Sequence, residues 1–354
     1  MKISVIIPCY NRATVVAETI RCLLRQTLCP DEIIAVDDGS TDNTAQVVEQ
    51  IAEELAAGSI LKIQNPKSKI QNLKLPHLRL IRQVNAGPGA ARNAGLAVAN
   101  GEYIWFMDSD DLASHNKLEI QVRALEQSGA DIAICPWIKC RLEDGRAHPE
   151  THVLQQRGLP RDPARALVCE WSIMLQSALF RRSLLDKVGG FDPGYLVAED
   201  QLYFLKCLLA RARVVSTPEC LVVYRTQGAN KLTQSGSPSE RRLVDWARFL
   251  LEARRLFLLD GQDPSRWFFF RLRLWVSWKE LAGCDTPEAM EISGQIASVL
   301  GSPSTWAPHY VLAESCLQWF GGFRQRAFGD RSPLSMRASR PPRQSGQGES
   351  SDIA

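Results

Sequence analysis

The 354-residue chain lacks several features that define common protein classes. No uncharged apolar run approaches the roughly 18 residues that a membrane-spanning helix requires. At the amino terminus only Lys2 precedes a short apolar run, which breaks at Pro8 and is too short for a secretory signal. The net charge of +3 comes without the basic face or stripe that nucleic-acid binding requires. We therefore expect a cytoplasmic protein that does not bind nucleic acid.

Several short signatures are also absent. The chain has neither the GxxxxGK stretch with a following Ser or Thr of a P-loop nor the GxSxG turn of a hydrolase. Its ten cysteines include no CxxC pair, which argues against a structural zinc site. Most lie inside apolar runs and are typical of buried thiols in a reducing compartment. They are Cys9, Cys22, Cys29, Cys135, Cys140, Cys169, Cys207, Cys220, Cys284 and Cys316.

Four short apolar runs, each followed by a polar loop and a helical pattern, dominate the first part of the chain. The runs cover residues 3–7, 32–36, 78–84 and 103–107. Their alternation with helical patterns predicts a parallel, doubly wound α/β sheet whose loops gather along one edge. With 45% hydrophobic residues, the chain can bury one large α/β core and an accessory unit.

Carboxylates follow the fourth apolar run directly. Asp108, Asp110 and Asp111 stand where a buried strand is expected to end, which is where open α/β sheets bind ligands. Carboxylates at such a strand exit can hold a divalent cation, which in turn holds the phosphates of a substrate. The same residues also serve as turns and helix caps, so the pattern alone leaves both interpretations open.

Aromatic and polar residues follow the first two runs. Tyr10 offers a ring on which a nucleobase can stack, and Pro8 and Asn11 shape the same loop. Asp37 and Asp38 present acceptors suited to the imino hydrogen of a uracil-like or thymine-like base. Two alternatives stay open, because Tyr10 can equally fill the core and Asp37 can serve only the turn.

A small-residue helix follows the third run and begins near Arg92. The planar guanidinium of Arg92 can bind a phosphate or a carboxylate, whereas a solvated position is the alternative. The segment 87–92 also resembles a dinucleotide-binding fingerprint. Its third small residue is replaced by Arg92, whose bulk opposes close helix packing, so a dinucleotide-dependent oxidoreductase is disfavoured.

Six motifs, in this order over about residues 1–230, resemble those of the family 2 glycosyltransferases of GT-A fold. They are SVIIPCYNR, VDDGSTDNT, NAGPGAARNAG, MDSDD, GGFD at 189–192 and the acidic pair Glu199-Asp200. The resemblance implies an inverting transferase that moves a sugar from a nucleotide diphosphate sugar, with UDP-type donors favoured, to a sugar or lipid-linked acceptor. It also implies Mg²⁺ or Mn²⁺ on the diphosphate, and a place in polysaccharide, glycolipid or glycan assembly.

The resemblance assigns roles to individual side chains. Asp110 is the expected metal ligand, Asp108 approaches the ribose of the donor, and Asp38 contacts its base. Asp111 is expected to cap the helix that starts near Asn116, although the roles of the three neighbouring aspartates are interchangeable by sequence. The expected nucleotide-sugar site comprises Pro8, Tyr10, Asn11, Asp38, Arg92 and Asp108.

Inverting transfer also requires a base that takes the proton of the attacking hydroxyl. By resemblance Asp200 is this general base, and Glu199 supports it or binds the acceptor. The alternative role of both carboxylates is to stabilise the start of the helix that follows them. A catalytically silent sugar-nucleotide-binding or scaffold protein is the rival class, and the presence of both Asp110 and Asp200 argues against it.

One position departs from the family pattern. Many relatives have a His shortly after a Tyr-Arg pair, but this chain has Gln227 in that place. A neutral amide is a poor metal ligand, so a third protein ligand to the cation is in doubt.

We expect a GT-A domain at 1–235, containing a surface insertion at 59–77, then a helical accessory region at 236–330 and a disordered tail at 331–354. The accessory region combines arginines with aromatic residues between 241 and 278. Such helices either pack against the transferase domain or lie peripherally on the inner face of an anionic membrane, which suits a lipid-linked acceptor.

Overall fold

The computed structural model describes residues 1–58, 75–143, 146–151, 153–155, 158–227, 240–301 and 309–311. The chain forms two compact units, one of residues 1–159 and 173–234, the other of residues 160–172 and the chain from 235 onward. Most of the expected insertion at 59–77 and all of the expected tail at 331–354 lie outside the described residues.

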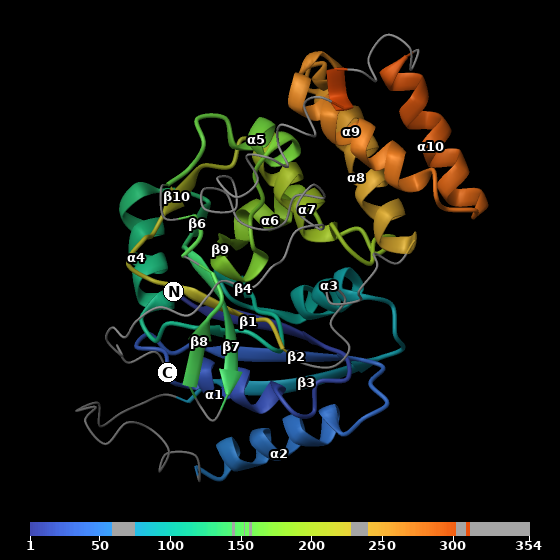
Figure 1. Ribbon diagram of the computed structural model, residues 1–354. Coiled ribbons are helices and arrows are strands. Elements are labelled where there is room, and N and C mark those ends of the chain that lie inside the picture. The colour runs from blue at the N-terminus through green and yellow to red at the C-terminus, as the bar shows by residue number, and fades with distance from the viewer. Residues whose placement is uncertain are drawn as a thin grey trace, which may run out of the picture. The chain divides into compact units, whose positions relative to one another are not determined.

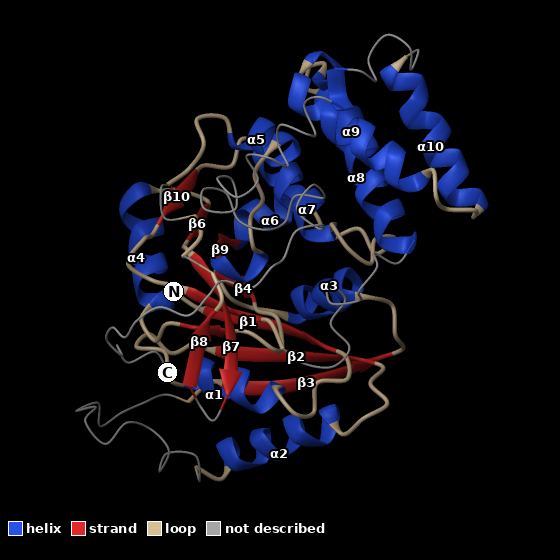
Figure 2. Cartoon of the chain, viewed as in Figure 1, coloured by secondary structure: helices blue, strands red, loops and turns tan. Residues whose placement is uncertain are grey.

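The first unit is built around a seven-stranded, mostly parallel sheet (Figures 1 and 2). Its strands are β1 (Ile3–Cys9), β2 (Glu32–Asp38), β3 (His77–Gln83), β4 (Tyr103–Phe106), β6 (Ile132–Ile134), β9 (Ala178–Arg181) and β10 (Val214–Ser216). They lie in the order β10-β6-β9-β4-β1-β2-β3. The four strands predicted from the sequence form a continuous parallel block, whereas β9 runs antiparallel to both of its neighbours.

Helices cover both faces of this sheet, because its central strands β1, β2 and β4 are buried on both faces. One face packs against α1 (Val16–Leu24), α2 (Thr44–Ala56) and α4 (Lys117–Ser128) in a single apolar core. On the other face lie α3 (Pro88–Val98) and α7 (Glu199–Leu209), and α6 (Arg182–Val188) packs beside α7. Close packing of α3 requires Gly95, because a Cβ there would collide with Ile6. Figure 1 shows α2 and α3 on opposite sides of the sheet.

A small second sheet lies in the same unit. Its strands are β5 (Leu112–Ala113), β7 (Trp137–Glu143), β8 (Arg146–Pro149) and β11 (Val222–Arg225), in the order β5-β11-β7-β8. The antiparallel pairing of β11 with β5 places the end of β11 beside the loop that follows β4. A short 3-10 turn, η2 (Leu175–Ser177), leads into β9.

The second unit is helical. It contains α5 (Pro163–Cys169), α8 (Glu240–Leu259), the 3-10 turn η3 (Pro264–Arg266), α9 (Phe268–Leu281) and α10 (Pro287–Leu300). The helices α8, α9 and α10 pack against one another, and α5 packs on α9. In the part of the chain that the structure describes, no helix has both the length and the apolar character needed to cross a membrane.

The strand order explains where a ligand can bind. β1 lies between β2 and β4, so the chain winds first toward β2 and β3 and then returns to add β4 on the other side of β1. Such a reversal separates the loops that leave two neighbouring strands and opens a crevice at their carboxyl ends. The loops after β1 and β4, which carry Tyr10 and Asp108, meet at this point.

Candidate active site

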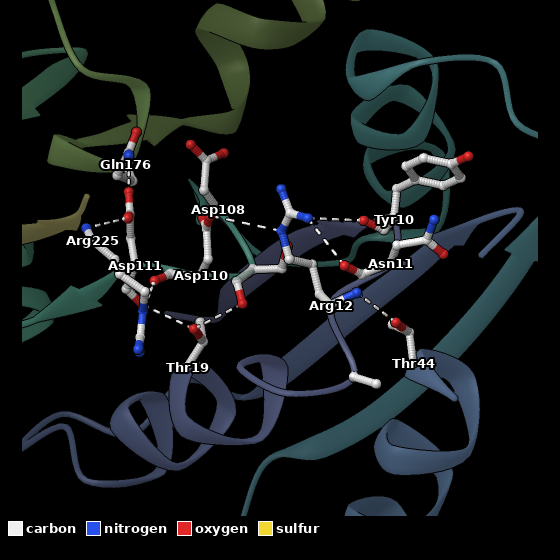
Figure 3. Close-up of polar contacts among 12 residues, drawn as sticks. Tyr10, Asn11, Arg12, Thr19, Thr44, Asp108, Asp110, Asp111, Gln176 and Arg225 are labelled. Atoms are coloured by element: carbon white, nitrogen blue, oxygen red, sulfur yellow. Dashed lines mark hydrogen bonds and ion pairs between the residues drawn. The ribbon is translucent and has the colours of Figure 1, made fainter. Parts of the chain in front are cut away.

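The loop after β1 is fastened to the loop after β2. Asn11 adopts a left-handed conformation (φ 53°), and its Oδ1 accepts a 2.8 Å hydrogen bond from the Thr41 amide. The Asn11 amide in turn donates to Ser40 Oγ across 2.9 Å. Tyr10, which precedes Asn11, keeps 44% of its surface exposed (Figure 3). Its ring is therefore outside the core and free to stack on a planar group.

The two aspartates at the end of β2 are buried and hydrogen-bonded within the protein. Asp38 accepts from the amides of Ala86 and Gly87, each across 2.9 Å, and from Gln83 Nε2 across 2.7 Å. Asp37 accepts from the Ser40 amide across 3.2 Å. Asp38 thus organises the loop between β3 and α3, in which Gly87 has a φ of 89° that favours glycine. The contact of Asp38 with a nucleobase stays a prediction.

The three aspartates after β4 have different surroundings (Figure 3). Asp108 and Asp110 keep 32% and 14% of their side chains exposed, and Asp110 Oδ2 lies 3.7 Å from Arg12 Nε. Asp111 is fully buried, where it accepts from the Arg225 amide across 2.9 Å and from Gln176 Nε2.

The expected capping role of Asp111 is wrong. The helix α4 begins after Asn116 without any side-chain cap, and both carboxylate oxygens of Asp111 accept from residues elsewhere. Asp111 instead ties the loop after β4 to the end of β11, because buried carboxylate oxygens require hydrogen-bond donors.

Arg92 joins two acidic segments. It projects from α3, keeps only 6% of its side chain exposed, and donates to Asp108 across 2.9 Å and to Glu199 across 2.6 Å. Its guanidinium also lies over the Phe191 ring, 5.5 Å from the centroid. Although burial alone lowers it, the pKa of Arg92 is raised by the charges of Glu199 and Asp108, so the side chain stays cationic. The solvated position considered from the sequence does not apply.

The acidic pair begins α7. Glu199 is 8% exposed, and burial raises its pKa to about 7 against the opposing charge of Arg92. Asp200 is partly exposed, and one of its oxygens accepts from the Gln201 amide across 2.8 Å. Ala198, just before the pair, has a φ of 65°, a strained conformation for a residue other than glycine. The pair therefore combines one buried carboxylate with one that solvent and a substrate can reach.

Sequence reasoning missed Arg225 as a member of this site. Arg225 Nε donates to the Asp110 carbonyl across 2.8 Å, and its guanidinium also pairs with Glu18 of α1. Arg225 thereby fixes the backbone of Asp110, and with it the position of the Asp110 carboxylate. The only sequence signal is its position at the end of an apolar run, because Asp111 lies 114 residues earlier in the chain.

Gln227 is committed to the second sheet. Its Oε1 accepts from the Leu142 amide across 2.9 Å, and its Nε2 donates to the Leu142 carbonyl. The side chain in this way prolongs the pairing of β11 with β7. Both ends of the Gln227 amide are therefore engaged by the Leu142 backbone.

The donor set fits a hard divalent cation that is shared with a substrate. Among the described residues, no group of three or more His, Cys, Asp or Glu side chains could enclose a metal. Mg²⁺ and related ions are commonly held by one or two carboxylates together with water and substrate phosphates. The accessible carboxylates of Asp108 and Asp110 match that second arrangement, and Arg12 now supplies positive charge to Asp110.

Comparisons with known proteins identify the family to which the chain belongs. Residues 4–189 match Glycosyl transferase family 2. An uncharacterized glycosyltransferase, EpsJ of Bacillus subtilis, is 30% identical over 242 residues, which are 66% of this chain and 63% of that protein. Poly(ribitol-phosphate) beta-N-acetylglucosaminyltransferase TarS of Staphylococcus aureus is 29% identical over 232 residues, covering 64% of this chain and 36% of TarS. The chain thus spans less than two thirds of either relative.

Solved structures show the same fold. TarS residues 1–349 in complex with UDP-GlcNAc superpose with a TM-score of 0.56 at 20% identity, covering 85% of this chain and 82% of that one. The mannosyltransferase PcManGT of Pyrobaculum calidifontis, in complex with GDP-Man and Mn²⁺, gives a TM-score of 0.51 at 21% identity, covering 90% and 87%. The predicted GT-A fold with a carboxyl-terminal helical extension is confirmed.

The fold is that of an α/β protein of the GT-A type. The chain belongs to glycosyl transferase family 2.

Proposed function

We propose that the protein is an inverting glycosyltransferase that moves a sugar from a nucleotide diphosphate sugar to an acceptor hydroxyl. The observation that carries the proposal is the buried Arg92, which connects the aspartate loop after β4 to the acidic pair at the start of α7. Arg92 thereby connects Asp108, on the donor side, with Glu199, which precedes the proposed base Asp200. Polysaccharide, glycolipid or glycan assembly is the setting that such a transfer serves.

On the donor side, the exposed ring of Tyr10 stacks on the base, while Pro8 and Asn11 shape the loop that presents it. Asp38 accepts the imino hydrogen of the base, and Asp108 approaches the ribose. A UDP-type donor is favoured, because the TarS structure was solved with UDP-GlcNAc and shares this fold. Because PcManGT was solved with GDP-Man, guanosine diphosphate sugars should be tested as donors too.

Asp110, with Asp108 beside it, would hold a Mg²⁺ or Mn²⁺ ion. When bound, such an ion acts as a Lewis acid that stabilises the charge on the departing diphosphate. The role of the protein is to present these carboxylates at a fixed position. Arg225 does so by anchoring the Asp110 backbone, and Arg12 neutralises Asp110 until a cation takes its place.

On the acceptor side, Asp200 takes the proton of the attacking hydroxyl. The Asp200 side chain is partly exposed, so a substrate can approach it, whereas Glu199 is buried. Glu199 supports the pair by accepting a 2.6 Å hydrogen bond from Arg92. Attack on the face of the sugar opposite the diphosphate then inverts the anomeric centre.

We place the enzyme in the cytoplasm, peripherally at the inner face of the membrane, with a sugar or lipid-linked acceptor. Support comes from the nine cysteines that the structure describes, which are all unpaired thiols, as in a reducing compartment.

The direct test incubates the purified chain with individual nucleotide sugars, with and without Mn²⁺. Release of nucleoside diphosphate and the shift in melting temperature are both measured. We expect a UDP-sugar to stabilise the protein more strongly with Mn²⁺ than without it and to be cleaved slowly in water. Stabilisation without turnover on any offered acceptor would instead indicate a silent binding protein, and the absence of both effects would refute the donor class.

A further inference from the structure

One asparagine side chain fastens the loop between α6 and α7 to α3. Asn93 Nδ2 donates to the Phe191 carbonyl, and Asn93 Oδ1 accepts from the Phe191 amide, each across 2.8 Å. Both backbone groups of Phe191 are thus paired with a single side-chain amide, in the way that facing residues of two antiparallel strands pair. The two residues are 98 positions apart in the sequence, so the contact orders the loop and not the helix itself.

Two glycines allow the loop to lie this close to α3. A Cβ on Gly190 would lie 2.6 Å from Asn93 Oδ1, a distance that real Cβ atoms do not tolerate. A Cβ on Gly89 would lie 3.2 Å from the Asp192 carbonyl oxygen. A larger residue at position 190 would therefore displace the asparagine from the Phe191 backbone.

The buried ring of Phe191 lies between two elements of the candidate active site. It stacks on the Tyr203 ring of α7, with centroids 4.0 Å apart and an interplanar angle of 17°. It also meets the Phe106 ring edge to face, with centroids 5.0 Å apart. Phe106 ends β4, just before the aspartate loop, and Tyr203 lies one helical turn beyond Glu199. A close-packed ring that touches both elements fixes their separation.

Arg92 and Asn93 are neighbours on α3 and act on the same region in different ways. Arg92 pairs with the charged groups of Asp108 and Glu199. Asn93 holds the Phe191 backbone, and with it the ring on which α7 rests. The asparagine therefore acts through the loop and its aromatic ring, and not through the acidic side chains themselves.

We propose that Asn93 is a positioning residue for sugar transfer, which holds Phe191 as a spacer between the aspartate loop and the start of α7. The spacer sets the distance between the bound donor and Asp200. Transfer is sensitive to this distance, since a displacement of about 1 Å at a reacting group costs about 10²-fold in rate. The inference rests on the proposed function, because it takes Asp200 as the base, whereas the contacts of Asn93 and Phe191 do not depend on it.

The first test needs no ligand. Hydrogen exchange of the full chain is followed by mass spectrometry in the wild type and in Asn93→Ala. We expect the amides at the start of α7, residues 199–205, to exchange about tenfold faster in the variant, because the hydrogen bonds that hold their spacer are lost. Asn100→Ala is the matched control. It removes a 3.2 Å hydrogen bond to the Val98 carbonyl just beyond the other end of α3, and it should leave α7 unchanged.

The second test separates positioning from loss of structure. The probe is UDP-GlcNAc with Mn²⁺, and the release of UDP is measured. Asn93→Ala should lower kcat about tenfold or more while KM and the calorimetric affinity for UDP stay as in the wild type. The calorimetric stoichiometry counts the folded sites, so kcat is expressed per site that binds nucleotide. A variant that is only partly folded would lose sites without losing kcat per site.

Phe191→Leu removes the stacked ring and leaves the backbone of residue 191 available to Asn93. It should lower the same kcat, and the double variant should be little worse than the more impaired single variant, because both changes disturb one contact. Unchanged exchange in α7, unchanged kcat in Asn93→Ala, or independent effects of the two changes would each overturn the inference.

Failure of the proposed function has a different signature. In that case the wild type would cleave no nucleotide sugar, or Asp200→Asn would cleave it normally, although exchange in α7 would still respond to Asn93→Ala. The role of Asn93 in transfer would then be refuted together with the base. Failure of the positioning inference alone would leave Asp200→Asn impaired and Asn93→Ala fully active.

Discussion

Arg92 donates a 2.6 Å hydrogen bond to Glu199 across 107 residues of sequence, and both side chains are more than nine-tenths buried. The other arm of the same guanidinium holds Asp108 at 2.9 Å. One cation therefore serves two carboxylates that belong to different halves of the proposed reaction.

Replacing Arg92 separates its structural role from its positioning role. Arg92→Met should destabilise the fold by about 3–5 kcal/mol, because a buried carboxylate loses its partner. Arg92→Lys keeps the charge but cannot direct two donors at two carboxylates, so transfer should fall about 10²-fold with a smaller loss of stability. Urea unfolding and kcat/KM measure the two effects. Arg82→Lys, at an exposed pair with Glu49, is the control, and unaltered transfer by Arg92→Lys would contradict the positioning role.

The raised pKa of Glu199 predicts a pH dependence of stability. Its pKa rises from an ordinary 4.5 to about 7, so between these values the native state binds a proton that the unfolded state does not. The contribution is fully present below pH 4.5 and is lost as the pH rises to about 7. The stability of the wild type relative to Glu199→Gln should decline over this window, as chemical denaturation at several pH values would show. Exposed Glu102→Gln is the control, and a constant difference would mean that Glu199 ionises normally.

Asp200 is the proposed base, and its replacement should affect chemistry alone. Asp200→Asn should bind donor and metal as the wild type does, while transfer falls about 10²–10⁴-fold, the usual effect of a positioned base. Calorimetry with the nucleotide sugar and a transfer assay provide the comparison. Asp186→Asn, an exposed aspartate of α6, should leave both unaffected. Normal transfer by Asp200→Asn would assign the base elsewhere.

Asp110 is the proposed metal ligand. Asp110→Asn should weaken donor binding in the presence of Mn²⁺ and leave the weaker metal-free binding unchanged, because an amide is a poor ligand for a hard cation. Titrating Mn²⁺ at fixed donor concentration measures the effect. A Mn²⁺ requirement identical to that of the wild type would move the ligand to another residue.

Arg225 holds the Asp110 backbone in place through the Asp110 carbonyl. Replacing Arg225 should therefore weaken metal binding at Asp110. Lysine cannot reach both the Asp110 carbonyl and Glu18, the two groups that the guanidinium contacts. Arg225→Lys should raise the Mn²⁺ concentration needed for half-maximal activity about 10–100-fold, as loss of a supporting partner of a metal ligand does. An equal fall in activity at every Mn²⁺ concentration would point instead to general loss of structure, which thermal unfolding would reveal.

Periodicity was sufficient to predict the core of the fold. The runs at 3–7, 32–36, 78–84 and 103–107 became parallel neighbours because strands buried on both faces have near-continuous apolar sequences. The antiparallel β9 and the two-residue β5 have no such signature, since short strands are defined by their partners. The position of α5 beside α9 likewise depends on tertiary contacts that local sequence does not encode.

The positions of some candidate site residues could be predicted from the residue type and from its place at the end of a strand. Asp108 and Asp110 are accessible at the expected edge of the sheet. Asp111 differs because a carboxylate followed by a helix is typical of a cap, yet its donors come from Gln176 and Arg225, 65 and 114 residues away. Partners at such separations cannot be read from one sequence.

The hydrogen bonds of Asp38 have a consequence for how variants of this family member should be interpreted. Asp38 fixes the amides of Ala86 and Gly87, immediately before the helix that carries Arg92. Removing its carboxylate would release that helix start as well as any contact with a base. Inactivity of an Asp38 variant therefore reports on catalytic alignment and donor recognition together, and a nucleotide-affinity measurement is needed to tell them apart.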